Sequence, residues 1–563
     1  MIEEITHLLK KASIKAGIID PFIKLEHPED ISHGDFSTNV AMVYTKVLKI
    51  APKILAEKIV EEFNKDLPST LSNATVAGPG FINIYVHNSA VTKNTTSVIS
   101  LKENYGRSDI GGGKKIIVEY SSPNIAKPFT IGHLRSTIIG DAIANIYDFL
   151  GYKVIRDNHL GDWGTQFGKL LFAIDKWGDW DKIEKSDSPI KDLVALYVKF
   201  HDEALIDKSY EDQARNLFKI LESGENSDIT EKWRKCIELS KKEFSKIYDK
   251  LGVSFDTEFG ESMFASPEKS NEILEILKSK NLLTTSENAQ VVIFENEKYP
   301  PLIIQKSDGT TIYATRDLAT DWYRKNTYGK DLMIVNEVGS EQTLYFRQLF
   351  EIERLLGWFE IGERIHVSHG LYRFKDGKMS TRKGNVIWLD DIIDEAEKRA
   401  VALNPESAND VAIGAIKFND LKRDCAHDIV FDWDEIMNMT GDSGPYLQYA
   451  CVRAEAVLDK AKEKGLKVDT SGTRPDIVSL DMLERYMMHF EEKLVFSANS
   501  FKPNILAGYL INLASFFNVF YAQTVIVDEK EEGTAYKLAV TQAFIYTMRN
   551  GLKLLGIKVP KRM

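Results

Sequence analysis

The stretch from residue 114 to residue 150 constrains the fold most, because a strand pattern changes to a helix pattern within it. Residues 114–120 form a short apolar run with β-branched side chains, which is typical of a strand buried between two layers. Apolar side chains then recur at helical spacing from Leu134 to Leu150. Pro123 and Pro128 lie between the two patterns and exclude a regular helix or a central strand there. The pattern predicts a strand, a loop and a helix of an α/β sheet.

The loop between this strand and this helix has the features of a phosphate site. Gly132 allows a ligand to approach the backbone where the helix begins. A helix N-terminus also offers unpaired N–H groups and the positive end of the helix dipole. Lys127 and His133 add a mobile and a titratable positive charge beside it. A helix start with an incidental histidine has the same local pattern, so these residues alone leave both interpretations open.

The same loop carries a longer motif. Ser121–Phe129 reads Ser-Ser-Pro-Asn-Ile-Ala-Lys-Pro-Phe, which resembles the signature of arginyl-tRNA synthetases at nine consecutive positions. The next four residues resemble the ATP-binding His-x-Gly-His element of class I aminoacyl-tRNA synthetases, with Thr130 in place of the first histidine. A threonine hydroxyl can bind a phosphate or ribose oxygen but carries no charge. The resemblance implies catalytic roles for Lys127 and His133, and ATP binding by Pro128, Thr130, Gly132 and His133.

Residues 378–384 form a dense basic loop that ends in glycine. Most such loops are solvated surface, but this one lies between the strand-like segments Ile365–Ser368 and Val386–Leu389. It resembles the second class I signature, Lys-Met-Ser-Lys-Ser, whose cations stabilise the pyrophosphate leaving group. Thr381 replaces the second lysine, so that charge is assigned to Arg382 or Lys383. The resemblance implies catalytic roles for Lys378 and Arg382, and ATP contacts by Gly370, Lys378, Met379 and Ser380.

Two further segments predict an amino-acid pocket. Residues 158–166 carry two glycines around Asp162-Trp163 and follow a strand pattern, so they predict a loop at the sheet edge where ligands bind, or a turn with a buried tryptophan. Tyr313–Leu318 enters a predicted helix, where Asp317 fits either dipole complementation or a bidentate guanidinium partner. This second segment resembles the arginine-binding Tyr-x-Thr-Arg-Asp of the family. The resemblance implies arginine binding by Glu119, Ser121, Asn124, His159, Tyr313, Asp317 and Gln342.

The regions that flank the sheet predict RNA contacts. Residues 1–112 have mixed helix and strand patterns and resemble the N-terminal domain of the family, which contacts the outer corner of tRNA. By that resemblance Phe81 stacks on a base and Asn83 reads its edge, although both residue types also serve in packing. Residues 169–290 are mostly helical in period and match the position of a family insertion that contacts the acceptor end of tRNA.

The chain reads as helices after residue 392. The predicted helices are Ala450–Lys464, Leu480–Phe496, Asn504–Val519 and Tyr536–Leu555. A helical bundle can be purely architectural. The start of this one resembles the anticodon-binding domain of the family, and the last five residues resemble its docked C-terminus. The resemblance implies tRNA contacts by Tyr446, Tyr449, Arg453 and Met563.

Composition narrows the class of protein. A net charge of −11 argues against a wholly basic nucleic-acid coat. The cysteines, Cys236, Cys425 and Cys451, have neither metal-ligand nor disulfide spacing, which favours a reducing compartment. Residues 1–17 carry Glu3 and Glu4 and lack an apolar core long enough for export, so we expect no signal peptide. We also expect no membrane span, a cytoplasmic location and no membrane or DNA partners.

The predicted architecture is a multidomain α/β protein. A Rossmann-like parallel-sheet catalytic domain spans 113–391, between an N-terminal α+β module (1–112), a connecting stem (392–440) and an all-α bundle (441–563). The resemblance implies a monomeric arginine–tRNA ligase that forms arginyl-adenylate from L-arginine and ATP and transfers arginine to the 3′ end of tRNA-Arg. Mg2+ accompanies ATP, with no permanent cofactor or resident metal. Two other classes stay open: an adenylate-forming enzyme with a small-molecule acceptor, and a non-catalytic RNA binder.

Overall fold

The computed structural model describes residues 1–28, 33–224, 226–374, 387–402 and 404–563. The chain divides into two compact units. One contains Met1–Tyr105, Ala450–Glu492 and Ile511–Asn550. The other contains Gly106–Tyr449, Lys493–Leu510 and Gly551–Met563. Each unit therefore combines three segments that are not contiguous in the sequence.

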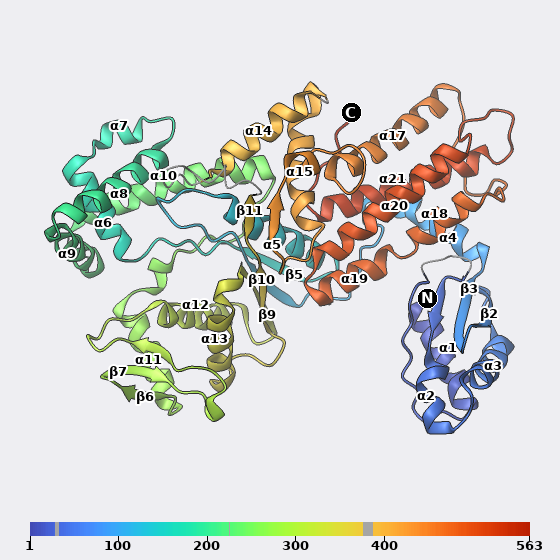
Figure 1. Cartoon of the computed structure of the whole chain (residues 1–563), viewed down its shortest axis with the longest axis horizontal. Coiled ribbons are helices and arrows are strands. Elements are labelled where there is room, and N and C mark those ends of the chain that lie inside the picture. Colours follow the sequence, from blue (N-terminus) through green and yellow to red (C-terminus); the bar gives the residue numbers. More distant parts are fainter. Residues whose placement is uncertain (29–32, 225, 375–386, 403) are drawn as a thin grey trace. The chain divides into compact units, whose positions relative to one another are not determined.

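A four-stranded parallel sheet forms the centre of the larger unit; Figure 1 labels its strands β5, β9 and β10. The strand order is β10-β9-β4-β5. Its strands are β4 (Lys115–Glu119), β5 (Lys153–Asp157), β9 (Leu332–Gly339) and β10 (Arg364–His369). Consecutive residues of β4 are buried, as expected for a strand covered on both faces. The chain leaves β4 toward β5 on one side and leaves β9 toward β10 on the other. The carboxyl ends of β4 and β9 therefore form a topological switch point, where ligands bind in open α/β sheets.

Three helices surround this switch point: α5 (Ile131–Phe149), α12 (Tyr313–Tyr328) and α13 (Thr343–Leu355). Helix α5 follows β4 and is buried along nearly its whole length. Gly140 permits this close packing, because a Cβ there would lie 2.2 Å from the Cβ of Tyr120. The strand, loop and helix expected between residues 114 and 150 are confirmed.

The region between β5 and β9 is mostly helical, as predicted. Its long amphipathic helix α10 ends at Gly252, which adopts the left-handed conformation (φ 66°) that glycine tolerates best. The elements of the region are α6 (Thr165–Trp177), α7 (Trp180–Glu184), α8 (Pro189–Ile206), α9 (Ser209–Ser223), α10 (Ser227–Leu251), α11 (Pro267–Ser279), β6 (Leu283–Ser286), β7 (Ala289–Val292) and β8 (Leu302–Gln305).

The stem that follows the sheet departs from the sequence prediction in two places. It contains β11 (Tyr372–Phe374), α14 (Leu389–Val401), α15 (Ala408–Leu421), β12 (Ile429–Phe431) and α16 (Trp433–Ile436). The expectation of helices alone is wrong at β12, a three-residue strand that pairs in parallel with β11. The strand expected at Val386–Leu389 is also wrong at its end, because Leu389 begins α14. The strand β12 and the start of α14 both depend on contacts with residues distant in the sequence, and local periodicity does not reveal such contacts.

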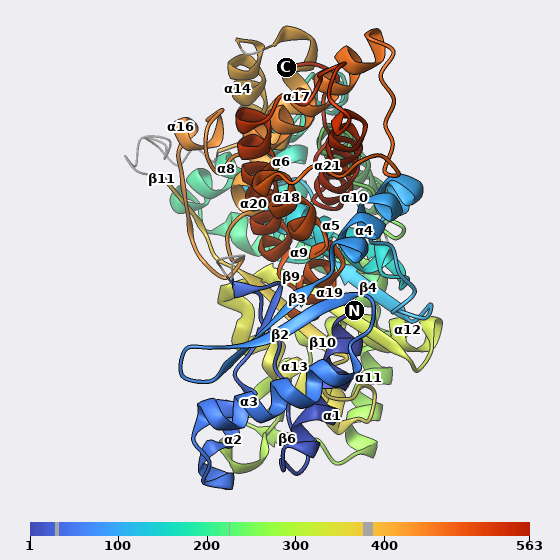
Figure 2. The same ribbon diagram turned by 90° about the vertical axis from the view of Figure 1, so that its right-hand side faces the viewer.

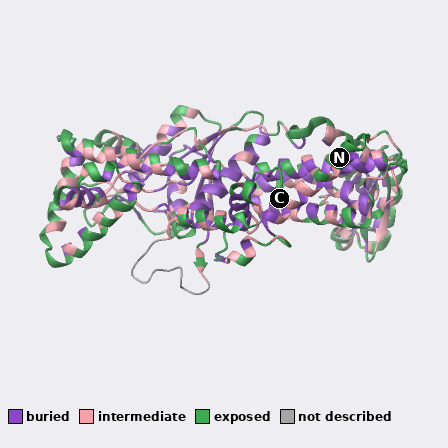
Figure 3. Ribbon diagram, turned by 90° about the horizontal axis from the view of Figure 1, so that it is seen from above, coloured by how far each residue is buried: buried purple, intermediate pink, exposed green. Residues whose placement is uncertain are grey.

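The smaller unit contains a three-stranded antiparallel sheet with the order β1-β3-β2 (Figure 2). Its strands are β1 (Phe36–Thr38), β2 (Leu71–Ala77) and β3 (Phe81–Val86), and its N-terminal helices are α1 (Ile2–Lys15), α2 (Val40–Leu48), α3 (Pro52–Phe63) and α4 (Asn88–Leu101). Ile5, Leu9, Leu55 and Ile82 lie in one apolar core beneath the sheet. On many helices of the chain, buried and exposed residues alternate along the ribbon (Figure 3), as expected of amphipathic helices.

The C-terminal helices are α17 (Gly444–Glu463), α18 (Val478–Met487), α19 (Phe490–Ser500), α20 (Pro503–Gln523) and α21 (Thr534–Leu554). One predicted helix, Leu480–Phe496, is wrong because the chain breaks between α18 and α19. The break places His489 against His27, with 3.7 Å between ring centroids. Its apolar spacing continues across the turn, so periodicity alone does not show it.

Helix α20 is the one helix in the described part of the chain that is long and apolar enough to cross a membrane. The sequence prediction that no stretch approaches such a span is therefore wrong for these residues. Leu506, Leu513 and Phe517 of this helix are buried, as in the core helix of a folded protein.

Candidate active site

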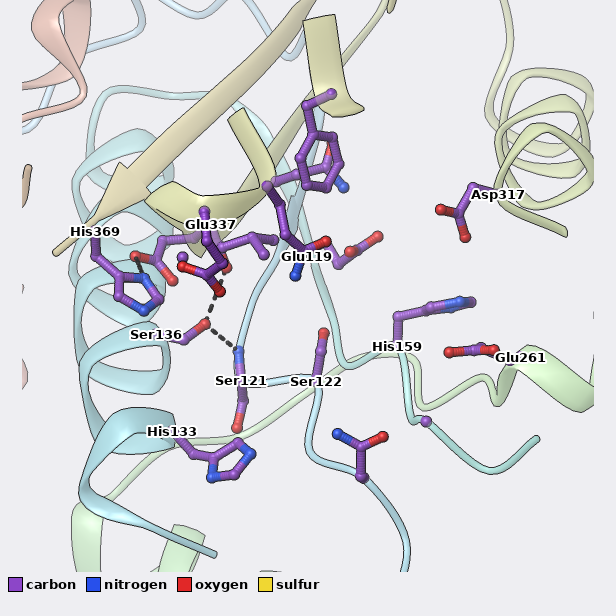
Figure 4. Close-up of a pocket in the computed structure, with 18 of the residues that line it drawn as sticks. Glu119, Ser121, Ser122, His133, Ser136, His159, Glu261, Asp317, Glu337 and His369 are labelled. Atoms are coloured by element: carbon purple, nitrogen blue, oxygen red, sulfur yellow. Dashed lines mark hydrogen bonds and ion pairs between the residues drawn. The ribbon is translucent and has the colours of Figure 1, made fainter. Parts of the chain in front are cut away.

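A cavity of about 540 Å3 lies at the carboxyl ends of β4, β9 and β10, beside the N-terminus of α5 (Figure 4). Many of its lining residues are polar, and nine of them are candidates from the sequence. These are Glu119, Ser121, Asn124, Thr130, Gly132, His133, His159, Asp317 and Gln342. Residues predicted from four distant segments therefore surround one space, at the switch point of the sheet.

The other sequence candidates do not line this cavity. Lys127 lines a separate, very small cavity with Gln166 and Phe167. Tyr313 is half exposed at the start of α12, and Gly370 lies between two residues that do line the larger cavity. Pro128 lies in the loop before α5. The predicted contacts of the basic loop, Lys378, Met379, Ser380 and Arg382, lie outside the described residues.

The loop before α5 holds strained backbone. Ser121, Ser122 and Ala126 have φ values of 71°, 43° and 55°, a region that residues with a Cβ seldom occupy. Hydrogen bonds hold this conformation: the Ser121 backbone N–H donates to Ser136 Oγ at 2.9 Å. Ser136 Oγ in turn donates to the Glu337 carbonyl at 3.0 Å. The loop is thereby tied to both α5 and β9.

His133 is a neutral group at the start of α5. Its Nδ1 accepts from the Thr130 backbone N–H at 3.0 Å, in a capping box that closes the first helical turn. Burial, with smaller effects from the charges of Lys127 and His369, lowers the pKa of His133 to about 4. The positive charge expected from the sequence is therefore absent near pH 7. The ring offers Nε2–H as a donor instead, because Nδ1 is the acceptor.

An acidic group occupies another side of the cavity (Figure 4). Asp317 accepts a hydrogen bond from the Tyr345 hydroxyl. Burial raises the pKa of Asp317 to about 7, although the Tyr345 hydroxyl and His159 oppose the rise. The carboxylates of Glu261 and Glu119 contribute to the raised value. A cation bound here would favour the ionised form of Asp317.

A buried ion network supports the floor of the cavity. Arg324, on α12, donates to Glu119 Oε2 at 2.5 Å, to Asp321 Oδ1 at 3.0 Å and to Asp157. All four side chains are buried. Burial alone would raise the pKa of Glu119, but Arg324 and His159 lower it, so Glu119 is an ionised carboxylate. The Arg324 guanidinium thus partly neutralises the negative charge of these three carboxylates at the edge of the sheet.

Several buried polar atoms around the cavity have no hydrogen-bond partner within the described residues. They are both ring nitrogens of His159, Oδ1 of Asn336 and Oε2 of Glu337. Leaving such a group unpaired costs about 1–3 kcal/mol. The cavity is therefore suited to a polar ligand that supplies these partners.

The comparisons with known proteins agree with this geometry. Residues 94–433 match the family model described as tRNA synthetases class I (R), catalytic domain. Residues 1–86 match the arginyl tRNA synthetase N terminal domain, and residues 447–563 match the DALR anticodon binding domain. Arginine–tRNA ligase of Clostridium botulinum is 40% identical over 97% of both chains. The chain belongs to the class I arginyl-tRNA synthetase family.

Other relatives and solved structures also match this chain over nearly its whole length. Arginine–tRNA ligase of Clostridium perfringens is 39% identical over 96% of both chains. The Thermus thermophilus arginyl-tRNA synthetase structure has a TM-score of 0.83 and 22% identity and covers all of both chains. The Plasmodium falciparum structure has a TM-score of 0.82 and 23% identity. The predicted fold class of this synthetase is therefore confirmed: a parallel-sheet catalytic domain with an N-terminal module and a C-terminal helical domain.

Sequence reasoning missed several residues that line the site of this synthetase. Glu261 lies between α10 and α11, within the mostly helical region, and has no recognisable local motif. Glu337 and Asn336 lie within β9, where a polar pair interrupts an apolar strand. Asp321 and Arg324 follow Asp317 at helical spacing on α12, a charged face that the sequence pattern does contain.

The residues predicted to contact tRNA lie in different settings. Phe81 is exposed at the start of β3, whereas Asn83 is buried and accepts from Ser37 Oγ at 3.1 Å. Arg453 donates to Asn518 at 2.8 Å. Near Met563, the Arg562 carbonyl accepts hydrogen bonds from Asn404 and Ser407. Tyr446 and Tyr449 lie half-buried in the first turns of α17.

Proposed function

We propose that this chain is an arginine–tRNA ligase whose first reaction takes place in the cavity above the sheet. The observation that carries the proposal is that one cavity is lined both by a half-buried acidic group, Asp317 and Glu261, and by the N-terminus of α5. The acidic group suits a cationic side chain, and the helix N-terminus suits phosphate. A cationic amino acid and ATP can therefore lie side by side with their reacting groups facing each other.

The acidic side supports recognition of arginine. Asp317 and Glu261 line this side, and two carboxylates can share the five N–H donors of a guanidinium. The ring of Tyr313 lies 4.8 Å from that of Tyr345, which places an aromatic surface beside the Asp317 partner. The proposed arginine contacts are Glu119, Ser121, Asn124, His159, Tyr313, Asp317 and Gln342, with Glu261 added from the geometry.

The N-terminus of α5 supports binding of the triphosphate. The backbone N–H groups there and the neutral His133 Nε2–H are donors toward phosphate oxygens. The arginine carboxylate attacks the α-phosphorus, and the bond to the bridging oxygen breaks, so pyrophosphate leaves and arginyl-adenylate forms. The terminal ribose hydroxyl of tRNA then attacks the arginyl carbonyl, and AMP leaves. We assign the remaining phosphate charge to Lys127, Lys378 and Arg382, with Pro128, Thr130, Gly132, Gly370, Met379 and Ser380 as further ATP contacts.

No group of three or more metal-ligating side chains occurs among the described residues. We propose that Mg2+ arrives with ATP, held by phosphate oxygens and water, as is usual for this ion.

The remaining assignments follow the family. We propose that Phe81, Asn83, Tyr446, Tyr449, Arg453 and Met563 contact tRNA-Arg, and that the protein is a cytoplasmic monomer. The domain boundaries at about residues 112, 391 and 440 also stay predictions. Phe81 is the residue of this set whose exposure best fits stacking on a base.

The test is ATP–pyrophosphate exchange and tRNA charging with arginine or lysine as the amino acid. We expect exchange and charging with arginine, and neither with lysine, because an ammonium group does not fill a bidentate guanidinium site. Adding and omitting tRNA separates the alternatives. Exchange without charging of tRNA would favour an adenylate-forming enzyme with another acceptor. Binding of tRNA without either reaction would favour a non-catalytic RNA binder.

The raised pKa of Asp317 predicts a pH dependence of arginine binding. In the empty pocket this carboxyl has a pKa of about 7, whereas the bound guanidinium stabilises its ionised form. Arginine binding must therefore release a proton below pH 7. We expect the arginine KM to be constant above about pH 8 and to rise about tenfold per pH unit well below pH 7. A KM that is constant from pH 5.5 to pH 8 would contradict the role of Asp317.

A further inference from the structure

Glu337 is a carboxylate of the cavity that neither the proposed arginine contacts nor the helix N-terminus uses. Glu337 lies on β9 with an exposed fraction of 1%. Its Oε1 lies 2.8 Å from His369 Nδ1, on the adjacent strand β10. Its Oε2 is one of the buried atoms without a partner within the described residues. Both residues line the cavity, so a bound ligand can supply the missing donor.

The surroundings of Glu337 make it a preorganised acceptor. Ser136 Oγ donates to the Glu337 carbonyl at 3.0 Å and accepts from the Ser121 backbone N–H at 2.9 Å. These bonds join β9 to α5 and to the loop after β4. Figure 4 shows Glu337, His369 and Ser136 together on one side of the cavity, away from Asp317 and Glu261. A group held at this position therefore belongs to a different part of the bound substrates than the guanidinium.

The pairing of Glu337 with His369 indicates which part of the bound substrates lies beside them. His369 Nδ1 already pairs with Glu337 Oε1 at 2.8 Å, and this contact raises the pKa of His369 although burial lowers it. Such a pair has less attraction for a cation than the carboxylates beside Asp317. A phosphate is an anion, so we do not expect it to replace His369 beside the Glu337 carboxylate. A neutral hydrogen-bond donor is the ligand group that satisfies a carboxylate oxygen without disturbing the pair.

We propose that Glu337 accepts a hydrogen bond from the nucleoside of ATP, with His369 as the residue that positions its carboxylate. This inference rests on the proposed function, because it requires ATP phosphates at the N-terminus of α5. With the phosphates there and arginine beside Asp317, the edge formed by β9 and β10 is the side left for ribose and base. Two groups of the nucleoside have the required chemistry, a ribose hydroxyl and the amino group of adenine.

The experiment compares Glu337→Gln and His369→Gln with the unaltered protein in steady-state tRNA charging. Each enzyme is assayed with ATP, 2′-deoxy-ATP, 3′-deoxy-ATP and purine riboside 5′-triphosphate, which lacks the amino group. We expect Glu337→Gln to raise the ATP KM about tenfold and to change the arginine KM less than about twofold. His369→Gln should raise the ATP KM by a smaller factor. The same analogue should remove the difference in KM from the unaltered protein for both variants.

One analogue should remove the difference between Glu337→Gln and the unaltered protein, since it lacks the donor that Glu337 binds. A deoxy analogue that does so identifies the ribose, and the purine riboside analogue identifies the base. Glu261→Gln is the matched control: we expect a raised arginine KM and an ordinary ATP KM. If Glu337→Gln does not fold, His369→Gln carries the same comparison.

The inference is overturned if the ATP KM of both variants stays within about twofold of the unaltered protein. It is also overturned if the arginine KM rises instead, or if every analogue keeps the full difference between the enzymes. Failure of the proposed function has another signature, because the unaltered protein would then fail to charge tRNA with arginine at all. The two failures are therefore distinguishable in one set of assays.

Discussion

Asp317→Asn should raise the arginine KM by about two to three orders of magnitude and leave the ATP KM within about twofold. The reason is that Asp317 is a half-buried carboxylate at the acidic side of the cavity. The amide of asparagine would direct an N–H donor at a guanidinium, which itself has only donors. Breaking a buried charge pair costs about 3–5 kcal/mol, which corresponds to this factor. Steady-state tRNA charging at varied arginine and at varied ATP measures the two constants separately.

The matched control is Asp308→Asn, in the exposed turn after β8. It removes the same charge far from the cavity lining, so both constants should stay unchanged. An Asp317→Asn enzyme with an ordinary arginine KM would remove this residue from the pocket. A variant whose ATP KM rises as much as its arginine KM would point to a collapsed site instead of a lost contact.

Arg324→Met should lower the free energy of unfolding by about 3–5 kcal/mol, the cost of leaving buried carboxylates without their partner. Arg324 contacts Glu119, Asp157 and Asp321, and all of these side chains are buried. Methionine fills much of the same space but neutralises none of the three charges. Urea unfolding at pH 7, followed by circular dichroism, measures the change.

The control for Arg324→Met is Arg354→Met, because Arg354 pairs with Glu351 on an exposed surface of α13. Exposed pairs contribute little to stability, so its urea midpoint should not change measurably. Arg324→Lys should recover part of the loss, since it restores the charge without the planar fork. Equal midpoints for Arg324→Met and the unaltered protein would show that the buried network does not stabilise the fold.

The elements that the sequence predicted well are those with long local patterns. Helix α5 and strand β4 carry apolar runs that one window contains, and the structure has them within about one or two residues of the expected bounds. Strand β12 and the break between α18 and α19 were missed because each depends on a partner elsewhere in the chain. Local propensity does not contain that information.

The residues of the candidate site also fall into two groups, those within a local sequence motif and those without one. Gly132, His133 and Asp317 lie in motifs that the sequence displays, and they line the cavity. Glu261 and Glu337 reach the cavity from segments without a motif, so only the folded chain brings them there. The charge of His133 could not be predicted from the sequence either, because burial, with smaller effects from Lys127 and His369, lowers its pKa to about 4.

The order in which the active-site unit becomes complete follows from its segments. Gln448, which is buried, donates to the Lys558 carbonyl at 2.7 Å, and the buried Lys417 ammonium donates to the Gly556 carbonyl at 2.9 Å. Both acceptors lie more than 100 residues later in the chain. During synthesis these two donors therefore have no acceptor until residues 551–563 have left the ribosome, long after the residues of the cavity are made. The larger unit therefore acquires its full set of internal contacts only late in translation.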